Sequence, residues 1–400
     1  MTDISVTWTP NQVRTLVQRL LRWFSQHARN LPWRHTRDPY ALWIAEVMLQ
    51  QTRVNTVIPY WQHWIQTIPD IPTLARTRQD QLRKLWAGLG YYRRLENLHR
   101  AAKLILKHHH GRFPDRYEDI LALPGIGRYT AGAIASTAFN LPTPVVDGNV
   151  ARVLSRLTGR PLRAPSAAAW SLATQLVQQA ARHKPIPLQP LAPPGRPRSA
   201  PLCPPCSALN QSLMELGATV CLPAVPRCHD CPLQTLCTYR HSSQPDPAPT
   251  RNHIPTTPRH LRVYLVRHNG RWLLHQRPAN QVNAGFWELP ATETNHVQPH
   301  SGHFFTNLDP WFEPLPDQPG LRLTHHITRH RYLVEARFAR LKQPWPGGRW
   351  LTPRQIQNRP LTRLTQKILH HLGVLPANPN APLAPLQPNK KNLCLPRHTA

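Results

Sequence analysis

The sequence predicts a multidomain protein in which an all-α region is followed by a smaller α+β region. Its 400 residues exceed what one hydrophobic core usually holds. Up to about residue 240 the apolar residues recur with helical spacing, and no convincing strand appears. After a polar, Pro-rich stretch at 241–258, the phrase LRVYLVRHNGRWLLHQR changes to strand spacing around an Asn269-Gly270 turn. We therefore expect a domain boundary at this stretch.

Helices are expected in the following order. In the first, over 13–28, six apolar side chains share one face: Val13, Leu16, Val17, Leu20, Leu21 and Phe24. Others are expected near 40–52, 56–66, 79–87, 95–107 and 117–121. Nine prolines and no acid between Lys184 and Pro205 predict a surface loop inserted between helices. The acid-free tail at 373–400 predicts a disordered basic segment.

The charge balance points to a polyanion. Lys and Arg total 49 against 19 Asp and Glu, a formal net charge of +30, and such an excess favours nucleic acid as partner. An anionic membrane surface is the other polyanion to consider. However, no stretch approaches the ~18 apolar residues of a spanning helix, and the N-terminus lacks signal-peptide order. We expect a cytoplasmic, nucleoid-associated protein that binds DNA and no membrane.

A glycine turn precedes a helix rich in small residues. In LPGIG, Gly125 and Gly127 allow a tight turn whose free N–H groups point outward at a helix N-terminus, which suits a DNA phosphate. An ordinary turn is the alternative. The phrase resembles the helix-hairpin-helix of DNA repair enzymes.

Twenty residues later, VVDGNVAR places Asp147 before another helix. An Asp in that position is most often an N-cap. The 67 residues between Asp147 and Glu215 contain no acid. A solitary carboxylate in such a basic stretch suits stabilisation of a cation. LPGIG and VVDGNV at this spacing resemble the helix-hairpin-helix-Gly-Pro-Asp superfamily of DNA glycosylases. The resemblance implies that Asp147 is catalytic and that Tyr129 and Asn149 position the reacting groups.

Glu46 lies within the apolar helix ALWIAEVMLQQT. Burial would remove its hydration and raise its pKa, so that it serves as a general acid, whereas a lone helix Glu usually faces solvent. EVMLQQTRV resembles the MutY family of adenine DNA glycosylases, which act on adenine opposite 8-oxoguanine. That resemblance implies that Glu46 protonates the extruded adenine, while Gln51 and Thr52 lie near the opposite base.

Further phrases resemble the same family. The resemblance implies an adenine pocket formed by Arg29, Leu31, Trp33 and Arg34 of HARNLPWR with Glu215 of NQSLMELGATVC. It also implies that Leu89, Gly90 and Tyr91 of WAGLGYYRR contact the 8-oxoguanine. A tight Gly turn with aromatic residues beside Arg93 and Arg94 can stack on bases and bind phosphates. The alternative is an aromatic helix end packed in the core.

Four of the seven cysteines form one motif, Cys221-x6-Cys228-x2-Cys231-x5-Cys237. Zinc is the competing metal, but zinc modules usually pair two close-set Cys units. One close pair with flanking single cysteines resembles the [4Fe–4S] segment of the endonuclease III and MutY glycosylases. We expect one such cluster. Cys203 and Cys206, in the Pro-rich insertion, are interpreted as incidental.

The C-terminal region, 259–372, contains GFWELP and resembles the Nudix-type domain appended to MutY enzymes. Nudix hydrolases need several acids on one helix, but here the acids between 291 and 320 are scattered among prolines: Glu293, Asp309, Glu313 and Asp317. We expect this domain to recognise 8-oxoguanine in DNA without hydrolysing nucleotides. The resemblance maps its lesion-contacting loop onto Thr328, Arg329 and His330, of which only the His is retained.

The fold class is therefore an all-α helix-hairpin-helix glycosylase with a [4Fe–4S] segment, plus a C-terminal α+β Nudix-like domain. The expected divisions are a glycosylase region at 1–240, a linker at 241–258, the Nudix-like domain at 259–372 and the tail. Within 1–240, a six-helix hairpin subdomain spans 35–145, and 1–34 with 146–240, including the insertion 184–205, forms the cluster subdomain.

The predicted function is a monomeric, monofunctional adenine DNA glycosylase of base-excision repair that acts on adenine opposite 8-oxoguanine or guanine in duplex DNA. An endonuclease III-like glycosylase/lyase is one alternative, but it uses a Lys where this chain has Tyr129, and a phenol forms no Schiff base. The other is a non-catalytic iron–sulfur DNA-binding protein, which would not require carboxylates at both 46 and 147.

Overall fold

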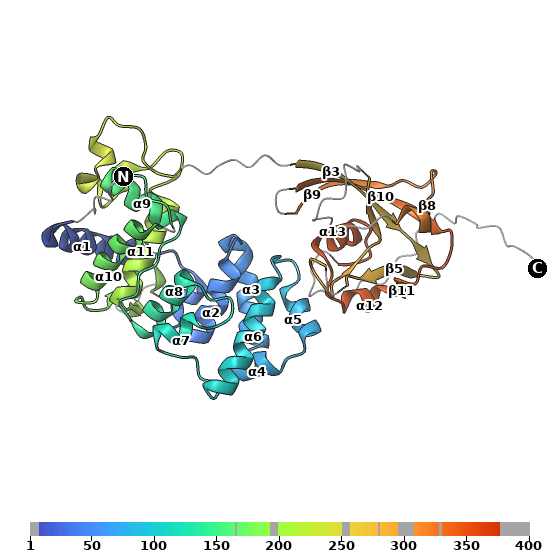
Figure 1. The fold of residues 1–400 in the computed structure, drawn as a ribbon, viewed down its shortest axis with the longest axis horizontal. Helices are drawn as coiled ribbons and strands as arrows, with labels where there is room; N and C mark the ends of the chain where they lie inside the picture. The colour runs from blue at the N-terminus through green and yellow to red at the C-terminus, as the bar shows by residue number, and fades with distance from the viewer. Residues whose placement is uncertain are drawn as a thin grey trace, which may run out of the picture. The chain divides into compact units, whose positions relative to one another are not determined.

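The structure is a computed structural model that describes residues 8–164, 166–192, 199–249, 257–278, 281–294, 308–327 and 330–376. The chain forms two compact units. Met1–Arg78 with Tyr91–His253 makes the helical unit, and Gln79–Gly90 with Ile254–Ala400 makes the C-terminal unit (Figure 1). Among the described residues, no helix is both long and apolar enough to cross a membrane.

The helical unit is built from α-helices joined by short connections. They are α1 (Pro10–His27), α2 (Pro39–Leu49), α3 (Val54–Thr67), α4 (Ile71–Arg76), α6 (Arg93–His108), α7 (Tyr117–Leu121), α8 (Arg128–Phe139), α9 (Gly148–Thr158), α10 (Ala167–Ala180) and α11 (Pro205–Thr219). The helices expected from periodicity form. Helix α2 ends three residues earlier than expected, because the backbone leaves the helix before Gln51, whose φ is 58°.

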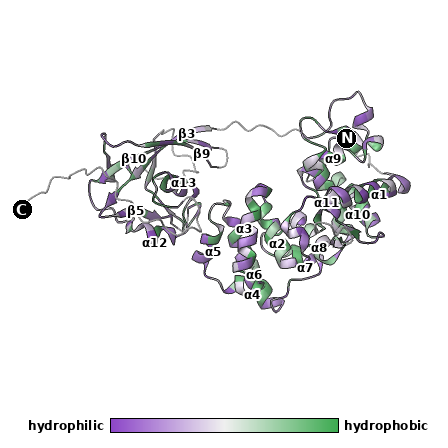
Figure 2. Ribbon diagram, turned by 180° about the vertical axis from the view of Figure 1, so that it is seen from behind, coloured by the Kyte–Doolittle hydropathy of each residue, from purple (hydrophilic) through white to green (hydrophobic). Residues whose placement is uncertain are grey.

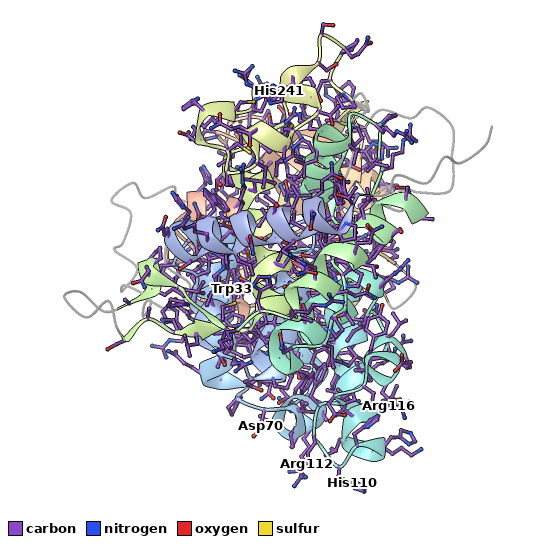
Figure 3. The ribbon with its side chains drawn as sticks, turned by 90° about the vertical axis from the view of Figure 1, so that its left-hand side faces the viewer. Trp33, Asp70, His110, Arg112, Arg116 and His241 are labelled. Atoms are coloured by element: carbon purple, nitrogen blue, oxygen red, sulfur yellow. The ribbon has the colours of Figure 1, made fainter. Side chains whose placement is uncertain are left out.

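Helix α1 is amphipathic and is capped at its N-terminus. Its apolar face is buried against α10 and α11, while its opposite face is polar (Figure 2). Thr9 and Gln12 form a capping box at its start, which satisfies two N-terminal donors. At one end of the unit, Asp70 caps α4 by accepting from the Thr73 N–H, near exposed His110 and Arg112 (Figure 3).

The Pro-rich insertion differs from the expected strandless surface loop. Its flanks pair as two short antiparallel strands, β1 (Ile186–Pro187) and β2 (Leu202–Cys203). Leu188, Leu191 and Cys203 are buried in the main hydrophobic core of the unit. Proline tolerates extended edge backbone, and the interspersed leucines provide apolar surface that the core excludes from water. Residues 193–198 lie outside the described part.

The C-terminal unit contains two sheets. Its strands are β3 (Thr257–Leu265), β4 (Arg267–His268), β5 (Arg271–Gln276), β6 (Trp287–Glu288), β7 (Ala291–Glu293), β8 (Phe312–Pro314), β9 (Leu321–Ile327), β10 (His330–Leu341) and β11 (Gly348–Leu351). One sheet has the order β7-β3-β10-β8 with β9 also on β10, and the other has β11-β5-β4 with β6 on β5. Helices α12 (Pro353–Gln357) and α13 (Arg363–His371) complete it, and Ile356, Ile368 and Leu369 join a core shared with both sheets.

The expected hairpin forms only in part. Its turn is confirmed, because Asn269 and Gly270 have φ of 45° and 73°, as a type I′ turn requires. However, only β4 pairs with β5 across the turn. The longer strand β3 lies in the other sheet, parallel to β10 and antiparallel to β7. A strand's long-range partners depend on which apolar faces pack together, which local spacing does not specify.

Residues 79–90 also depart from the expected division. The sequence assigns them to the 35–145 helical subdomain, whereas the structure groups them with the C-terminal unit. They contain α5 (Gln79–Trp86), and the Lys84 ammonium donates to the Asn358 side-chain oxygen within that unit.

Candidate active site

Glu46, Tyr129 and Asp147 interact with one another in the helical unit. Glu46 lies on α2 and is half-buried, and the Tyr129 hydroxyl of α8 hydrogen-bonds to its carboxyl group. Burial raises the pKa of Glu46 to about 7, the Asp147 charge adds to the increase, and the tyrosine bond opposes it. A carboxyl with this pKa is substantially protonated near neutral pH, so Glu46 can donate a proton.

Tyr129 remains a phenol. Burial, with the charges of Glu46 and Asp147, raises its pKa well above 10. Its hydroxyl also lies 3.2 Å from the Met214 sulfur on α11. A neutral hydroxyl positions a carboxyl group without taking its proton.

Asp147 serves as an N-cap and is the second carboxylate of this group. One oxygen accepts the Val150 N–H at 2.8 Å at the start of α9, and the other accepts the Asn149 amide at 2.9 Å. Both bonds restrain the carboxylate, so the structural and the catalytic interpretations of this Asp are compatible. A negative charge held there can stabilise a neighbouring cation.

Two residues that the sequence reasoning did not identify hold Asn149. The Arg152 guanidinium donates to the Asn149 side-chain oxygen at 2.8 Å and to the Gly217 carbonyl at 2.6 Å. Gly217 of α11 is needed for this approach, since a Cβ there would lie 2.6 Å from the Asn149 Cβ. The signal was present in the sequence as a small residue in the middle of a helix.

The glycine turn before α8 has the expected form. Gly125 has φ of 80°, and a Cβ there would lie 2.6 Å from the Asn97 Cβ, so both conformation and space require glycine. Gly127 is the N-cap of α8 with φ of −98° and open space around it. Its backbone suits other residues, but the missing side chain leaves the helix N-terminus accessible to an anion.

The segment before α2 is tied to α11 through Glu215. This buried carboxylate accepts from the Arg29 backbone N–H and side chain at 2.8–2.9 Å and from Arg34 at 3.1 Å. Burial alone would raise its pKa, but the Arg29 bonds and the Arg34 charge outweigh burial and lower the pKa to about 2. Glu215 is thus an ionised anchor and not a proton donor. Leu31 and Trp33, which belong to the same segment as Arg29 and Arg34, are buried, and Trp33 packs edge-on against Trp61.

The residues expected at the opposite base differ in exposure. Gln51 and Tyr91 are exposed and adopt positive φ, 58° and 48°, while Thr52 is half-buried. Gly90 also has a positive φ, 71°, with open space where a Cβ would stand. Leu89 is buried in this structure, so it presents little surface to a base.

Arg94 corrects one expectation. The sequence placed it with Arg93 as a phosphate-binding pair, but its guanidinium is buried and donates to the carbonyls of Val47, Met48 and Gln50. Arg93 is exposed. The two arginines differ in exposure because consecutive residues of a helix point about 100° apart.

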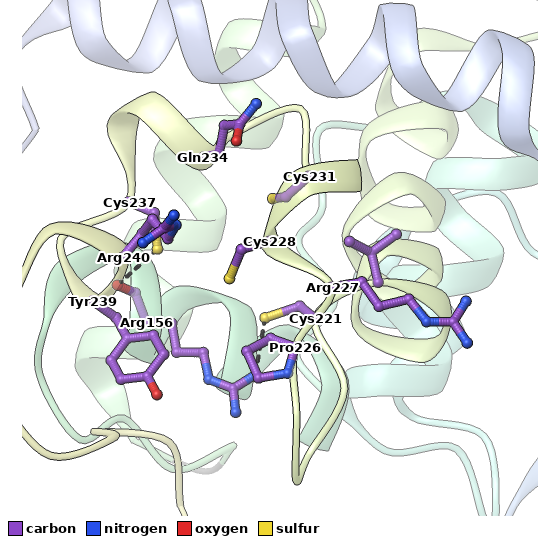
Figure 4. Close-up of a pocket in the computed structure, with 11 residues that line it drawn as sticks. Arg156, Cys221, Pro226, Arg227, Cys228, Cys231, Gln234, Cys237, Tyr239 and Arg240 are labelled. Carbon is purple, nitrogen blue, oxygen red and sulfur yellow. Dashed lines mark hydrogen bonds between the residues drawn. The ribbon is translucent and has the colours of Figure 1, made fainter.

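The four motif cysteines line one pocket together with Arg156, Tyr239 and Arg240 (Figure 4). Within the described residues, no three His, Cys, Asp or Glu side chains converge closely enough to hold a single metal ion. Their sulfurs nonetheless face the same space (Figure 4). A multinuclear group ligated by four separated thiolates fits this donor set better than one ion does.

Basic groups surround these thiols. The Arg156 guanidinium lies 3.3 Å from the Cys221 sulfur, and its other bonds include a bidentate pair with Asp246. Burial raises the pKa of Cys221, Cys231 and Cys237, so a bound cation is needed to favour their thiolates. Cys203 and Cys206 lie in the hydrophobic core away from this pocket, where burial raises the pKa of each thiol to about 11.

In the C-terminal unit, Thr328 and Arg329 lie outside the described residues. His330 begins β10 and is buried, with its ring edge-on to Tyr332. Three of the acids between 291 and 320 pair with arginines of β3 and β10: Glu293 with Arg259, Asp309 with Arg262, and Glu313 with Arg340. These pairs neutralise the carboxylates separately.

Comparison with known proteins gives two family matches. Residues 44–172 match the HhH-GPD superfamily base excision DNA repair protein model, and residues 262–371 match the NUDIX domain model. The adenine DNA glycosylase of Mus musculus is 32% identical over 446 aligned positions, which cover 93% of this chain and 81% of that protein. That of Buchnera aphidicola subsp. Acyrthosiphon pisum is 33% identical over 259 positions, 64% of this chain and 68% of that protein. The Arabidopsis thaliana relative is 35% identical over 338 positions, 73% of this chain but 50% of its own length.

Proposed function

This chain belongs to the adenine DNA glycosylases of the HhH-GPD superfamily, and on that premise we propose that it removes adenine opposite 8-oxoguanine or guanine from duplex DNA. The observation that carries the chemistry is the Glu46 carboxyl, whose pKa of about 7 leaves it able to donate a proton at neutral pH. The net charge of +30 supports a polyanionic substrate.

The proposed reaction begins with extrusion of the adenine nucleotide from the duplex. Glu46 passes its proton to adenine N7 while the bond between C1′ and N9 breaks, and the electron pair leaves with the base. The Asp147 carboxylate faces the sugar cation that remains. By analogy with retaining glycosidases, this carboxylate traps the cation briefly before water adds at C1′ and returns a proton to Glu46.

The remaining site residues act by position in this proposal. Tyr129 and Asn149 orient Glu46 and Asp147 through the hydrogen bonds described above. The buried Leu31 and Trp33 line the adenine pocket in this proposal. The ion pairs of Glu215 with Arg29 and Arg34 hold their segment in place. The exposed Gln51 and Tyr91, with Thr52 and Gly90, face the opposite base.

We also propose that Cys221, Cys228, Cys231 and Cys237 hold one [4Fe–4S] cluster. Their shared pocket, the bonded arginine and the thiol chemistry support this assignment. The cluster would fix the loop 221–237 beside α9. The C-terminal unit is proposed to contact the 8-oxoguanine through 328–330, with the enzyme acting as a monomer in the compartment that holds the chromosome.

The test is release of free base by the purified full-length protein. Adenine should appear from duplexes that pair it with 8-oxoguanine or guanine, and an adenine–thymine duplex of the same sequence is the control. Strand scission should require added alkali, because Tyr129 supplies no amine for a lyase step. Scission without alkali would favour the endonuclease III-like alternative, and binding without base release would favour a non-catalytic protein.

A further inference from the structure

Arg94 carries its positive charge at a position where the surroundings disfavour a cation. It is the second residue of α6, where the helix dipole disfavours a cation, and its side chain is buried. Burial lowers its pKa to about 10, so the guanidinium remains charged at neutral pH. A buried charge at a positive helix end requires compensating partners.

Those partners lie at the end of α2. Nη1 of Arg94 lies 2.8 Å from the Val47 carbonyl, 2.8 Å from that of Met48 and 2.6 Å from that of Gln50. These oxygens belong to the last turn of a helix and the residue after it, where carbonyls lack helical partners and the dipole is negative. Arg94 therefore caps the C-terminus of α2, the helix that carries Glu46, by donating to its last carbonyl groups.

The same guanidinium also contacts the two turns that contain the exposed residues Gln51 and Tyr91. Nη2 lies 3.3 Å from the Thr52 hydroxyl, next to Gln51, and Nε lies 3.4 Å from the Tyr91 carbonyl. The Tyr91 ring stands 5.5 Å from the guanidinium carbon. Gln51 and Tyr91 both adopt a left-handed backbone conformation that residues other than glycine rarely adopt. Such conformations persist where surrounding contacts impose them.

We propose that Arg94 is a positioning residue for the surface that contacts the base opposite adenine. It holds the turns that contain Gln51 and Tyr91 against the C-terminal end of α2, the helix that carries Glu46. This inference rests on the proposed function, because it concerns recognition of the base opposite adenine. Arg94 itself is buried and contacts no DNA in this role. A lysine keeps the charge but offers a single donor nitrogen, which cannot span the carbonyls and both turns.

The experiment compares wild type, Arg94→Lys and Arg100→Lys. Arg100 is an exposed arginine on the same helix whose guanidinium donates to the Asn97 side chain. Single-turnover excision rates, normalised to folded protein, are measured for adenine opposite 8-oxoguanine and opposite guanine. Arg94→Lys should reduce the ratio of the two rates by about tenfold, since small displacements of positioned groups cost this much or more. Arg100→Lys should keep the wild-type ratio.

A purely structural role would lower stability and both rates together without changing their ratio. An unchanged ratio in folded Arg94→Lys would therefore overturn the inference. If that variant does not fold, Arg94→Gln, which keeps a side-chain amide donor but no charge and no second donor nitrogen, is measured in its place, and its ratio decides in the same way. Absence of adenine release from both duplexes by the wild-type enzyme would instead contradict the proposed function, which separates the two failures.

Discussion

The Asn149 amide donates a hydrogen bond of 2.9 Å to the same carboxylate of Asp147 that caps helix α9. The capping bond and the proposed catalytic charge therefore depend on one side chain, but they make different chemical demands. A cap needs an acceptor oxygen, which Asn supplies as well as Asp, whereas a sugar cation needs a negative charge.

Asp147→Asn should consequently separate stability from catalysis. We expect adenine excision to fall by about 10²–10³-fold or more, with little change in melting temperature because the cap is retained. Single-turnover kinetics and thermal denaturation measure the two effects. Asp70→Asn, a comparable change at the exposed cap of α4, is the control and should alter neither. A lower melting temperature of Asp147→Asn together with a wild-type excision rate would assign Asp147 to the cap alone.

Glu46→Gln should abolish adenine release while leaving binding to the lesion duplex largely intact. The amide keeps the shape of the side chain but has no acidic proton, and general acids typically contribute about 10²–10⁴-fold. Binding is measured by fluorescence anisotropy and release by single-turnover cleavage. Excision near the wild-type rate would contradict the assignment.

The pH dependence tests the same carboxyl independently. Because burial raises the pKa of Glu46 to about 7, its protonated form predominates below that pH and is lost above it. The wild-type excision rate should therefore decline as pH rises through 7, approaching about tenfold per pH unit. A rate that stays constant from pH 6 to 9 under single-turnover conditions would show that protonated Glu46 is not required.

Glu215→Gln should reduce stability more than chemistry. Glu215 is 1% exposed and pairs with two arginines, one of them 43% exposed, so we expect a loss of about 3 kcal/mol and a clear fall in melting temperature. Because its pKa is lowered to about 2, this stabilisation is present above the ordinary pKa of a glutamate and is lost as pH falls toward 2. Glu96→Gln, on the exposed face of α6, provides the comparison, and equal melting temperatures for the two variants would refute the anchor.

Anaerobically purified protein should contain about four irons per chain and show a broad brown absorbance. Cys→Ser at 221, 228, 231 or 237 should lower the iron content, since each thiol lines the shared pocket. Cys203→Ser and Cys206→Ser are matched controls at buried thiols outside that pocket and should retain iron. Zinc without iron in the wild-type protein would overturn the cluster assignment.

The sequence by itself determined the local features of this protein. Helix α8 begins directly after Gly127, Asp147 caps α9, and Asn269 with Gly270 forms the expected turn, because caps and left-handed turns depend on residues a few positions apart. The motif phrases likewise sufficed to identify the family, since they report on residue types at set spacings.

Only the tertiary structure decided which long-range partners these residues have. Arg94 contacts carbonyls more than 40 residues earlier, and Glu215 accepts from an arginine 186 residues away. Strand β3 pairs with β10 and not with its neighbour in sequence, and the insertion contributes leucines to a core. Periodicity shows that a side chain prefers one face of an element, but the apolar surface and hydrogen-bond donors opposite that face come from distant segments. Their burial is settled by packing of the whole unit.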